Sequence, residues 1–130
     1  MKQLPMALPS TLRAYKAQKK AAGVGFDWPD VEGAFAKIHE EIDELLDEMQ
    51  AEVRDEEKIS GELGDLLFAV INVSRFLKIN PELALNKTTE KFIRRFQAIE
   101  ESESAKDRGL ENLSLEEMDN LWNRAKINDL

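Results

Sequence analysis

The stretch ISGELGDLLFAVINVSRFLKI, residues Ile59–Ile79, is the most apolar part of the chain. Arranged as a helix, it carries large apolar side chains on nearly every side. A helix that is apolar all round belongs in the interior of a helical bundle. We therefore predict that this stretch forms a central helix against which the rest of the chain packs.

Two carboxylates are set into this apolar helix. Glu62 and Asp65 stand three residues apart, and at about 100° per residue they share one narrow stripe with Asn72. Carboxylates are rarely buried unless they are paired or bind a metal, because an isolated buried charge is costly. The two residues therefore predict a cation beside this stripe, either a basic side chain or a metal ion.

The composition is that of an acidic protein without cysteine. We expect one helical domain over residues 1–130, with a frayed start over residues 1–9. The absence of cysteine excludes disulfides and thiolate metal sites and suits a reducing compartment, so a cytoplasmic protein is expected. The chain carries 26 Asp and Glu against 18 Lys and Arg, a net charge of −8, which disfavours nucleic acid as a partner. Neither a signal peptide nor the roughly 20 apolar residues of a membrane span is found, so no membrane partner is expected.

Start and stop signals predict an all-α bundle of about five helices joined by short connections. The expected helices cover about 11–22, 31–53 and 58–79, followed by one that starts at Pro81 and one that starts at Leu115. The residues expected to cap the first, second, fourth and last helices are Ser10, Asp30, Asn80 and Ser114, the last in a capping box with Glu117. The stretch 102–112 is expected to be a polar loop.

The second predicted helix carries an acidic stripe beside its apolar face, formed by Glu41, Glu44 and Glu48. A short connection makes this helix an antiparallel neighbour of the central one, so Glu41 and Glu44 can converge with Glu62 and Asp65. Carboxylates this close would repel one another without a cation, and oxygen ligands suit Mg²⁺ or Mn²⁺. Two alternatives stay open: an ordinary solvated acidic face, or salt bridges between these acids and basic residues of the fourth helix.

Zinc and di-iron centres fit the sequence less well. Zinc sites use Cys and His ligands, and the chain has no cysteine and one histidine, His39. Helical di-iron centres use Glu-x-x-His pairs, and His39 does not stand in one. Mg²⁺, with Mn²⁺ as a substitute, is therefore the expected cofactor.

The fourth predicted helix carries a basic stripe that includes Lys87, Lys91 and Arg95. Because Mg²⁺ often joins carboxylates to substrate phosphates, acids that face bases favour a polyphosphate substrate. In this interpretation Lys91 and Arg95 bind phosphate oxygens; in the alternative they belong to a solvated face. On the last helix, Trp122 can stack on a base while Lys126 reaches a phosphate, or the pair is simply one core and one surface residue.

Two short acidic motifs follow each other along the chain, EEIDE at 40–44 and ELGD at 62–65. They match an EExxE…ExxD signature, and with it the chain resembles the MazG family of nucleoside triphosphate pyrophosphohydrolases. The similarity extends over most of the chain, through LPSTLRAYKAQKKAAGVGFDW, GELGDLLFAVINVSRFL, EKFIRRF and LEEMDNLWNRAK. The chain most resembles the C-terminal domain of members with two such domains, or a stand-alone form. It departs at Gly61, where relatives often carry another acid.

The resemblance implies an all-α bundle that dimerises, requires Mg²⁺ and hydrolyses nucleoside triphosphates, ribo or deoxy, to monophosphate and pyrophosphate. Such an activity would serve nucleotide-pool house-cleaning. By motif match, the implied metal ligands are Glu41, Glu44, Glu62 and Asp65. The implied nucleotide contacts are Lys58, Lys91, Arg95, Trp122 and Lys126.

We accordingly predict metal-assisted hydrolysis, in which Mg²⁺ binds the triphosphate and lowers the pKa of a water. The predicted catalytic residues are Glu40, Glu41, Lys91 and Arg95. Of these, Glu40 orients or deprotonates the water, and the two basic residues stabilise charge on the pyrophosphate side. The alternatives are an all-α hydrolase restricted to deoxynucleotides or dUTP, and a non-enzymatic helical interaction module whose acids pair with the basic stripe.

The central helix also predicts a homodimer or a dimer of dimers. Five short helices must cover a helix with almost no polar face, and the basic first helix has little apolar surface to contribute. A second copy packed on the same helix would cover the remainder, and two-fold pairing is the commonest arrangement of this kind.

Overall fold

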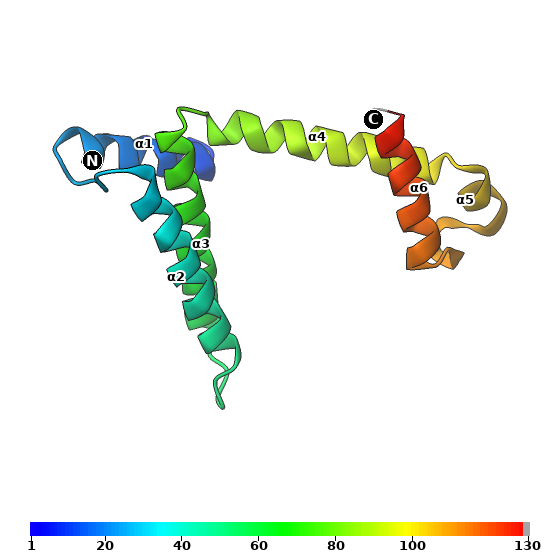
Figure 1. Cartoon of the computed structure of the whole chain (residues 1–130), viewed down its shortest axis with the longest axis horizontal. Helices are drawn as coiled ribbons and strands as arrows, with labels where there is room; N and C mark the ends of the chain where they lie inside the picture. The colour runs from blue at the N-terminus through cyan, green and yellow to red at the C-terminus, as the bar shows by residue number, and fades with distance from the viewer. Residues whose placement is uncertain (129–130) are drawn as a thin grey trace. The chain divides into compact units, whose positions relative to one another are not determined.

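The computed structural model describes residues 1–128, and over these residues it contains helices and no strands (Figure 1). The elements are α1 (Ser10–Gly23), α2 (Val31–Met49), α3 (Glu56–Phe76), α4 (Pro81–Glu100), α5 (Glu103–Arg108), the 3₁₀ turn η1 (Leu110–Asn112) and α6 (Leu115–Ile127). The predicted all-α fold is therefore confirmed. None of the helices in this described part combines the length and the apolar character needed to cross a membrane.

The chain divides into two compact units, Met1–Ala84 and Leu85–Leu130, with the boundary inside α4. The first unit holds α1, α2, α3 and the start of α4. The second holds the remainder of α4 together with α5, η1 and α6. The organisation of residues 1–130 as one domain stays a prediction.

Most of the predicted helix starts are found where the capping residues place them. Asp30 accepts a hydrogen bond from the backbone of Gly33, and Asn80 accepts from two backbone N–H groups in the first turn of α4. Ser114 forms the predicted capping box with Glu117. Ser10 was wrongly assigned as a cap: it is the first residue of α1 and makes no capping hydrogen bond in the described structure.

The connection between α2 and α3 also differs from the prediction. α2 ends at Met49 rather than near residue 53, and α3 begins at Glu56, two residues before the predicted start. The physical cause of the early start is Asp55, whose carboxylate accepts hydrogen bonds from the backbone N–H groups of Glu57 and Lys58, at 3.1 and 3.3 Å. Glu56 and Glu57 add negative charge to this first turn, where it is favourable.

In the first unit, α2 and α3 pack side by side as an antiparallel pair, as predicted (Figure 1). α1 packs against α3, and the contact includes a hydrogen bond of 2.8 Å from the Gln18 side-chain amide to the backbone carbonyl of Phe68. Thr11 of α1 donates to Glu82 in the first turn of α4. These contacts hold the stripe of α3 that carries Glu62 and Asp65 next to α2.

The prediction that α3 lies in the interior of a bundle is wrong for the single chain. Only Ala69 and Val73 of this helix are buried. The reason is that α1 and α2 are the helices that make extensive contacts with α3. Its remaining sides keep large apolar residues about half exposed, among them Leu63 (47%), Leu67 (57%), Phe68 (48%) and Val70 (48%).

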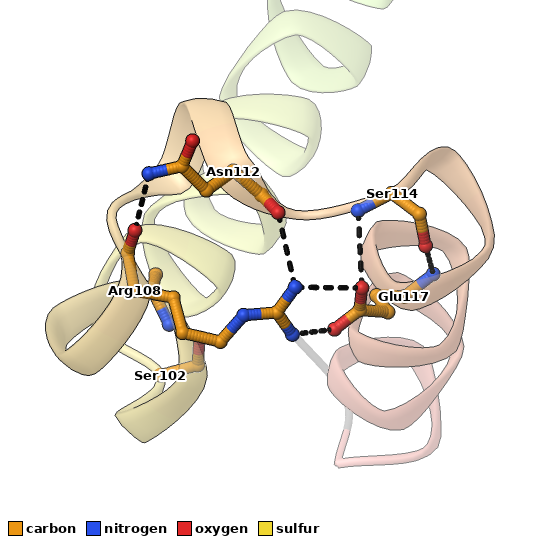
Figure 2. A network of polar contacts seen from close by, with 6 residues as sticks. Ser102, Arg108, Asn112, Ser114 and Glu117 are labelled. Carbon is orange, nitrogen blue, oxygen red and sulfur yellow. Dashed lines mark hydrogen bonds and ion pairs between the residues drawn. The ribbon is translucent and has the colours of Figure 1, made fainter.

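In the second unit, the stretch predicted to be a polar loop instead forms α5 and η1. Ser102 caps α5 by accepting from the backbone N–H of Ala105 at 3.2 Å, and Ala105 is buried. Figure 2 shows how Arg108 then joins this region to the start of α6: it pairs with Glu117 and donates to the backbone carbonyl of Asn112 at 3.0 Å. The prediction failed because this polar stretch has no apolar helical periodicity, and side-chain contacts such as the Ser102 cap give it its structure.

Candidate functional site

The structure brings together acids from α2 and α3. Glu41 of α2 and Glu62 and Asp65 of α3 each present one carboxylate oxygen, and these three oxygens lie within 4.8 Å of one another. We call Glu41, Glu62 and Asp65 the acid cluster. They are three of the four acids that the sequence predicted as metal ligands.

The burial of Glu41 and Glu62 distinguishes the acid cluster from a solvated acidic face. Glu41 is only 4% exposed and Glu62 is half-buried, whereas Asp65 is exposed. The Oε2 atoms of both residues are buried and have no hydrogen-bond partner among residues 1–128. Leaving buried carboxylate oxygens unpaired is costly, so the fold favours a cation at this point. A set of oxygen donors alone fits a hard divalent ion such as Mg²⁺ or Mn²⁺.

Glu44, the fourth predicted ligand, lies beside the acid cluster and responds to it electrostatically. Contact with Glu62, partial desolvation and the nearby charge of Glu41 raise the pKa of Glu44 to about 7. Like charges held close together disfavour full ionisation of all members. Glu44 is therefore partly protonated near neutral pH.

Lys37 is a neighbour of the acid cluster that the sequence analysis did not single out. Its Nζ atom lies 3.0 Å from Oε1 of Glu41 and 3.3 Å from Oε2 of Glu40. The hydrogen bond from Lys37 is the main cause that lowers the pKa of Glu41, and the same contact raises the pKa of Lys37. The signal in the sequence was its position one turn before Glu41 on the same face of α2. Glu40 itself is exposed and lies outside the three clustered oxygens.

A cavity of about 710 Å³ adjoins the acid cluster within the first unit. Glu41, Asp65 and Lys37 line it, and so do three aromatic residues, Phe26, Trp28 and Phe68. The remaining polar lining comes from α1, the loop before α2 and the end of α3, namely Gln18, Asp27, Asn72 and Arg75. Concave sites of this size, largely apolar with a few polar groups, are typical of small-molecule binding.

Arg75 fixes one side of this cavity. Its Nη1 atom donates to Asp27 at 3.0 Å, Nη2 donates to the other oxygen of the same carboxylate, and Nε donates to Asn72 at 2.9 Å. The side chains are mostly buried, with 12% of Arg75 and 25% of Asp27 exposed. This paired contact ties the loop before α2 to the last turn of α3. This pair was not predicted from the sequence, because its partners are 48 residues apart.

The Asp27–Arg75 pair predicts an acid-sensitive contribution to stability. The hydrogen bond from Arg75 lowers the pKa of Asp27 below its ordinary value of 3.8. Because the folded-state pKa is depressed, the contribution is present above about pH 4 and is lost as the pH falls through the lowered pKa. We expect Asp27→Asn to cost about 1 kcal/mol of unfolding free energy at pH 7, and progressively less below about pH 4.

Urea unfolding of wild type and Asp27→Asn from pH 7 to pH 3 would measure this difference, with Glu52→Gln in the exposed α2–α3 connection as control. A difference between the two proteins that stays constant over this range would contradict the assignment.

The predicted basic and aromatic contacts are distributed over both units. Lys58 is exposed in the first turn of α3, in the first unit. In the second unit, the guanidinium of Arg95 lies over the ring of Trp122, 5.4 Å from its centroid, and the same ring contacts Phe92. Lys91 and Lys126 of that unit are exposed. Trp122 and Arg95 thus contact each other, and their roles as nucleotide contacts stay predictions.

Comparison with known proteins gives a consistent family assignment. The sequence-family model described as the MazG nucleotide pyrophosphohydrolase domain matches residues 30–99. This range includes the four predicted metal ligands, Glu41, Glu44, Glu62 and Asp65. The chain is 40% identical over 127 residues to a nucleoside triphosphate pyrophosphohydrolase of Escherichia coli, covering 98% of this chain and 48% of the relative. It is 43% identical over 122 residues to the nucleoside triphosphate pyrophosphohydrolase/pyrophosphatase MazG of Thermotoga maritima, covering 94% of this chain and 46% of the relative. The chain therefore spans about half the length of these relatives.

Proposed function

The chain belongs to the MazG nucleotide pyrophosphohydrolase domain family, and from this membership we propose that it hydrolyses nucleoside triphosphates to the monophosphate and pyrophosphate. The observation that carries the proposal is the pair of buried, unpartnered carboxylate oxygens on Glu41 and Glu62, beside Asp65. Such an arrangement is costly without a cation, and phosphoanhydride hydrolysis uses one. The relatives named for this activity support the same reaction.

In this proposal Glu41, Glu44, Glu62 and Asp65 hold Mg²⁺, for which Mn²⁺ can substitute. When bound, the metal supplies positive charge to the phosphate oxygens and helps to activate water. The protein contributes the fixed positions of the acids, which the packing of α2 against α3 provides. Glu40, exposed and next to Glu41, is proposed to orient or deprotonate the water.

Two sets of nucleotide contacts are proposed: residues that line the cavity of the first unit, and residues that the family resemblance implies. We propose that the nucleoside lies in the cavity, against Trp28 and Phe68, with its phosphates toward Glu41 and Asp65. The aromatic side chains that line the cavity favour stacking of a flat base. The acids would repel the phosphates unless a metal ion lay between them. Lys58, Lys91, Arg95, Trp122 and Lys126 are proposed as further nucleotide contacts.

Product analysis tests this function. The purified protein is incubated with each common ribo- and deoxynucleoside triphosphate, with and without Mg²⁺, and the products are identified. Monophosphate and pyrophosphate in the presence of Mg²⁺ would support the proposal. Turnover confined to dUTP or to deoxynucleotides would support the narrower hydrolase. A folded protein without turnover and unaffected by metal would support the interaction module.

We also propose that the working unit is a homodimer or a dimer of dimers. The apolar residues left half exposed on α3 are joined by others on α2, namely Phe35 (46%), Ile42 (38%), Leu46 (44%) and Met49 (49%). A second copy that presents the same two helices can cover these side chains, and two-fold pairing is the commonest arrangement of this kind. The proposal is independent of the chemistry of the acid cluster.

Sedimentation in dilute buffer is expected to show no stable monomer, and dilution should reduce helicity and activity together. Replacing Leu67, 57% exposed, by Glu should favour the monomer, because a charge in the interface would lose its hydration. Exposed Lys20→Glu on α1 is the matched control. A wild-type monomer that is fully active at nanomolar concentration would contradict the dimer.

A further inference from the structure

Lys37 occupies a position between the acid cluster and the cavity. Its ammonium contacts Oε1 of Glu41 at 3.0 Å, and its side chain, 38% exposed, lines the cavity together with Asp65. The other oxygen of Glu41 is buried and has no hydrogen-bond partner within residues 1–128. The lysine therefore pairs with Oε1 of this buried carboxylate and leaves Oε2 available to a second cation.

Helix stabilisation alone does not account for this pair. Lysine placed N-terminal to glutamate at a spacing of four residues is the less favourable order for an isolated helix. Exposed pairs of this type contribute little. The distinguishing feature is Glu41, which is 4% exposed and shares its surroundings with two further acids. Lys37 is the basic side chain that contacts this carboxylate, with 3.0 Å between its Nζ atom and Oε1 of Glu41.

We propose that Lys37 pairs with the acid cluster in the metal-free protein and becomes a phosphate-binding residue when metal and nucleotide bind. Without metal, its ammonium pairs with the carboxylate of Glu41. With metal and nucleotide present, it turns from Glu41 toward the cavity and binds an oxygen of the triphosphate. The inference rests on the proposed function, because it needs both a metal on the acid cluster and phosphates in the cavity.

This role gives Lys37 opposite effects on two ligands. A positive charge beside the acid cluster repels an entering divalent ion, so removing it should tighten metal binding. The same charge attracts the triphosphate, so removing it should weaken nucleotide binding. A lysine that merely supports the helix would not do this, because its loss would loosen Glu41 and weaken both ligands or leave both unchanged.

The test measures both affinities directly on the whole chain at pH 8. Binding of Mn²⁺ alone is followed by electron paramagnetic resonance, and binding of α,β-methylene ATP at saturating Mg²⁺ by calorimetry. The variants are Lys37→Met, Lys37→Arg and the exposed control Lys20→Met on α1. Circular dichroism shows whether each variant is folded. Lys37→Arg, which keeps the positive charge, supplies a second readout if Lys37→Met does not fold.

For Lys37→Met we expect the dissociation constant of Mn²⁺ to fall about fivefold and that of the nucleotide analogue to rise about tenfold. Lys37→Arg should remain close to wild type in both. Unchanged or jointly weakened affinities in Lys37→Met, with normal Mn²⁺ binding by wild type, would overturn this inference alone. A wild-type protein that binds no Mn²⁺ would overturn the metal assignment, and this inference with it.

Discussion

Replacing Glu62 by Gln, or Asp65 by Asn, is expected to abolish Mg²⁺-dependent turnover in a protein that still folds. A neutral amide occupies the same space as the carboxylate but binds Mg²⁺ poorly, because this ion prefers charged oxygen ligands. Since disturbing even residues behind the ligands commonly costs 10- to 100-fold, we expect a loss of at least about hundredfold. Steady-state turnover at ordinary Mg²⁺ concentration measures the effect.

The same substitutions should leave the thermal stability of the metal-free protein unchanged or raise it. Glu62 presents a buried, unpartnered oxygen next to Glu41 and Glu44, so its replacement removes a repelling charge from the metal-free protein. The melting temperature without metal should therefore be equal to or above that of wild type. Asp43→Asn, at an exposed position of α2, is the control for loss of an acid outside the group. Near-normal turnover by Asp65→Asn would show that the metal assignment is wrong.

The second large effect is expected at the basic residues of α4. Lys91→Ala and Arg95→Ala should each lose roughly 2–4 kcal/mol of transition-state stabilisation, or about 30- to 1,000-fold in kcat/KM, if each contacts a phosphate oxygen. Lys91 is exposed, so its replacement should leave stability nearly unchanged. Arg95 also lies over the ring of Trp122, and losing that contact should cost about 0.5–1 kcal/mol of stability.

Paired measurements of kcat/KM and thermal unfolding separate catalysis from folding in these variants. Lys106→Ala on α5, also exposed, is the control for removal of a positive charge from the same unit. Unfolding of Lys91→Ala and Arg95→Ala, with unchanged activity per folded molecule, would instead support the interpretation of the basic stripe as a set of structural salt bridges.

The parts of the structure that depend on local chemistry were predictable from the sequence. Asp30, Asn80 and Ser114 mark helix starts because each side chain satisfies backbone N–H groups within three residues. The convergence of Glu41 with Glu62 and Asp65 was also predictable, since a short connection places two helices side by side and helical spacing selects their facing stripes.

The parts that depend on distant residues were not predictable in the same way. The apolar sequence of α3 predicts that this helix is buried, but it does not identify the surface that buries it. A single chain leaves Leu67 and Phe68 about half exposed. The cavity arises from the packing of three helices and a loop, and no local pattern reports it. Arg75 resembles an ordinary basic residue at a helix C-terminus until the fold places Asp27 against it.

Crystallography with Mn²⁺ tests directly whether the acid cluster binds a divalent metal, because anomalous scattering locates the ion independently of activity. Crystals soaked in Mn²⁺ should show an anomalous peak within coordination distance of the carboxylates of Glu41, Glu62 and Asp65, and the peak should be lost in Asp65→Asn. An active protein whose Mn²⁺ binds elsewhere, or whose acid cluster stays metal-free in crystals that bind nucleotide, would contradict the account.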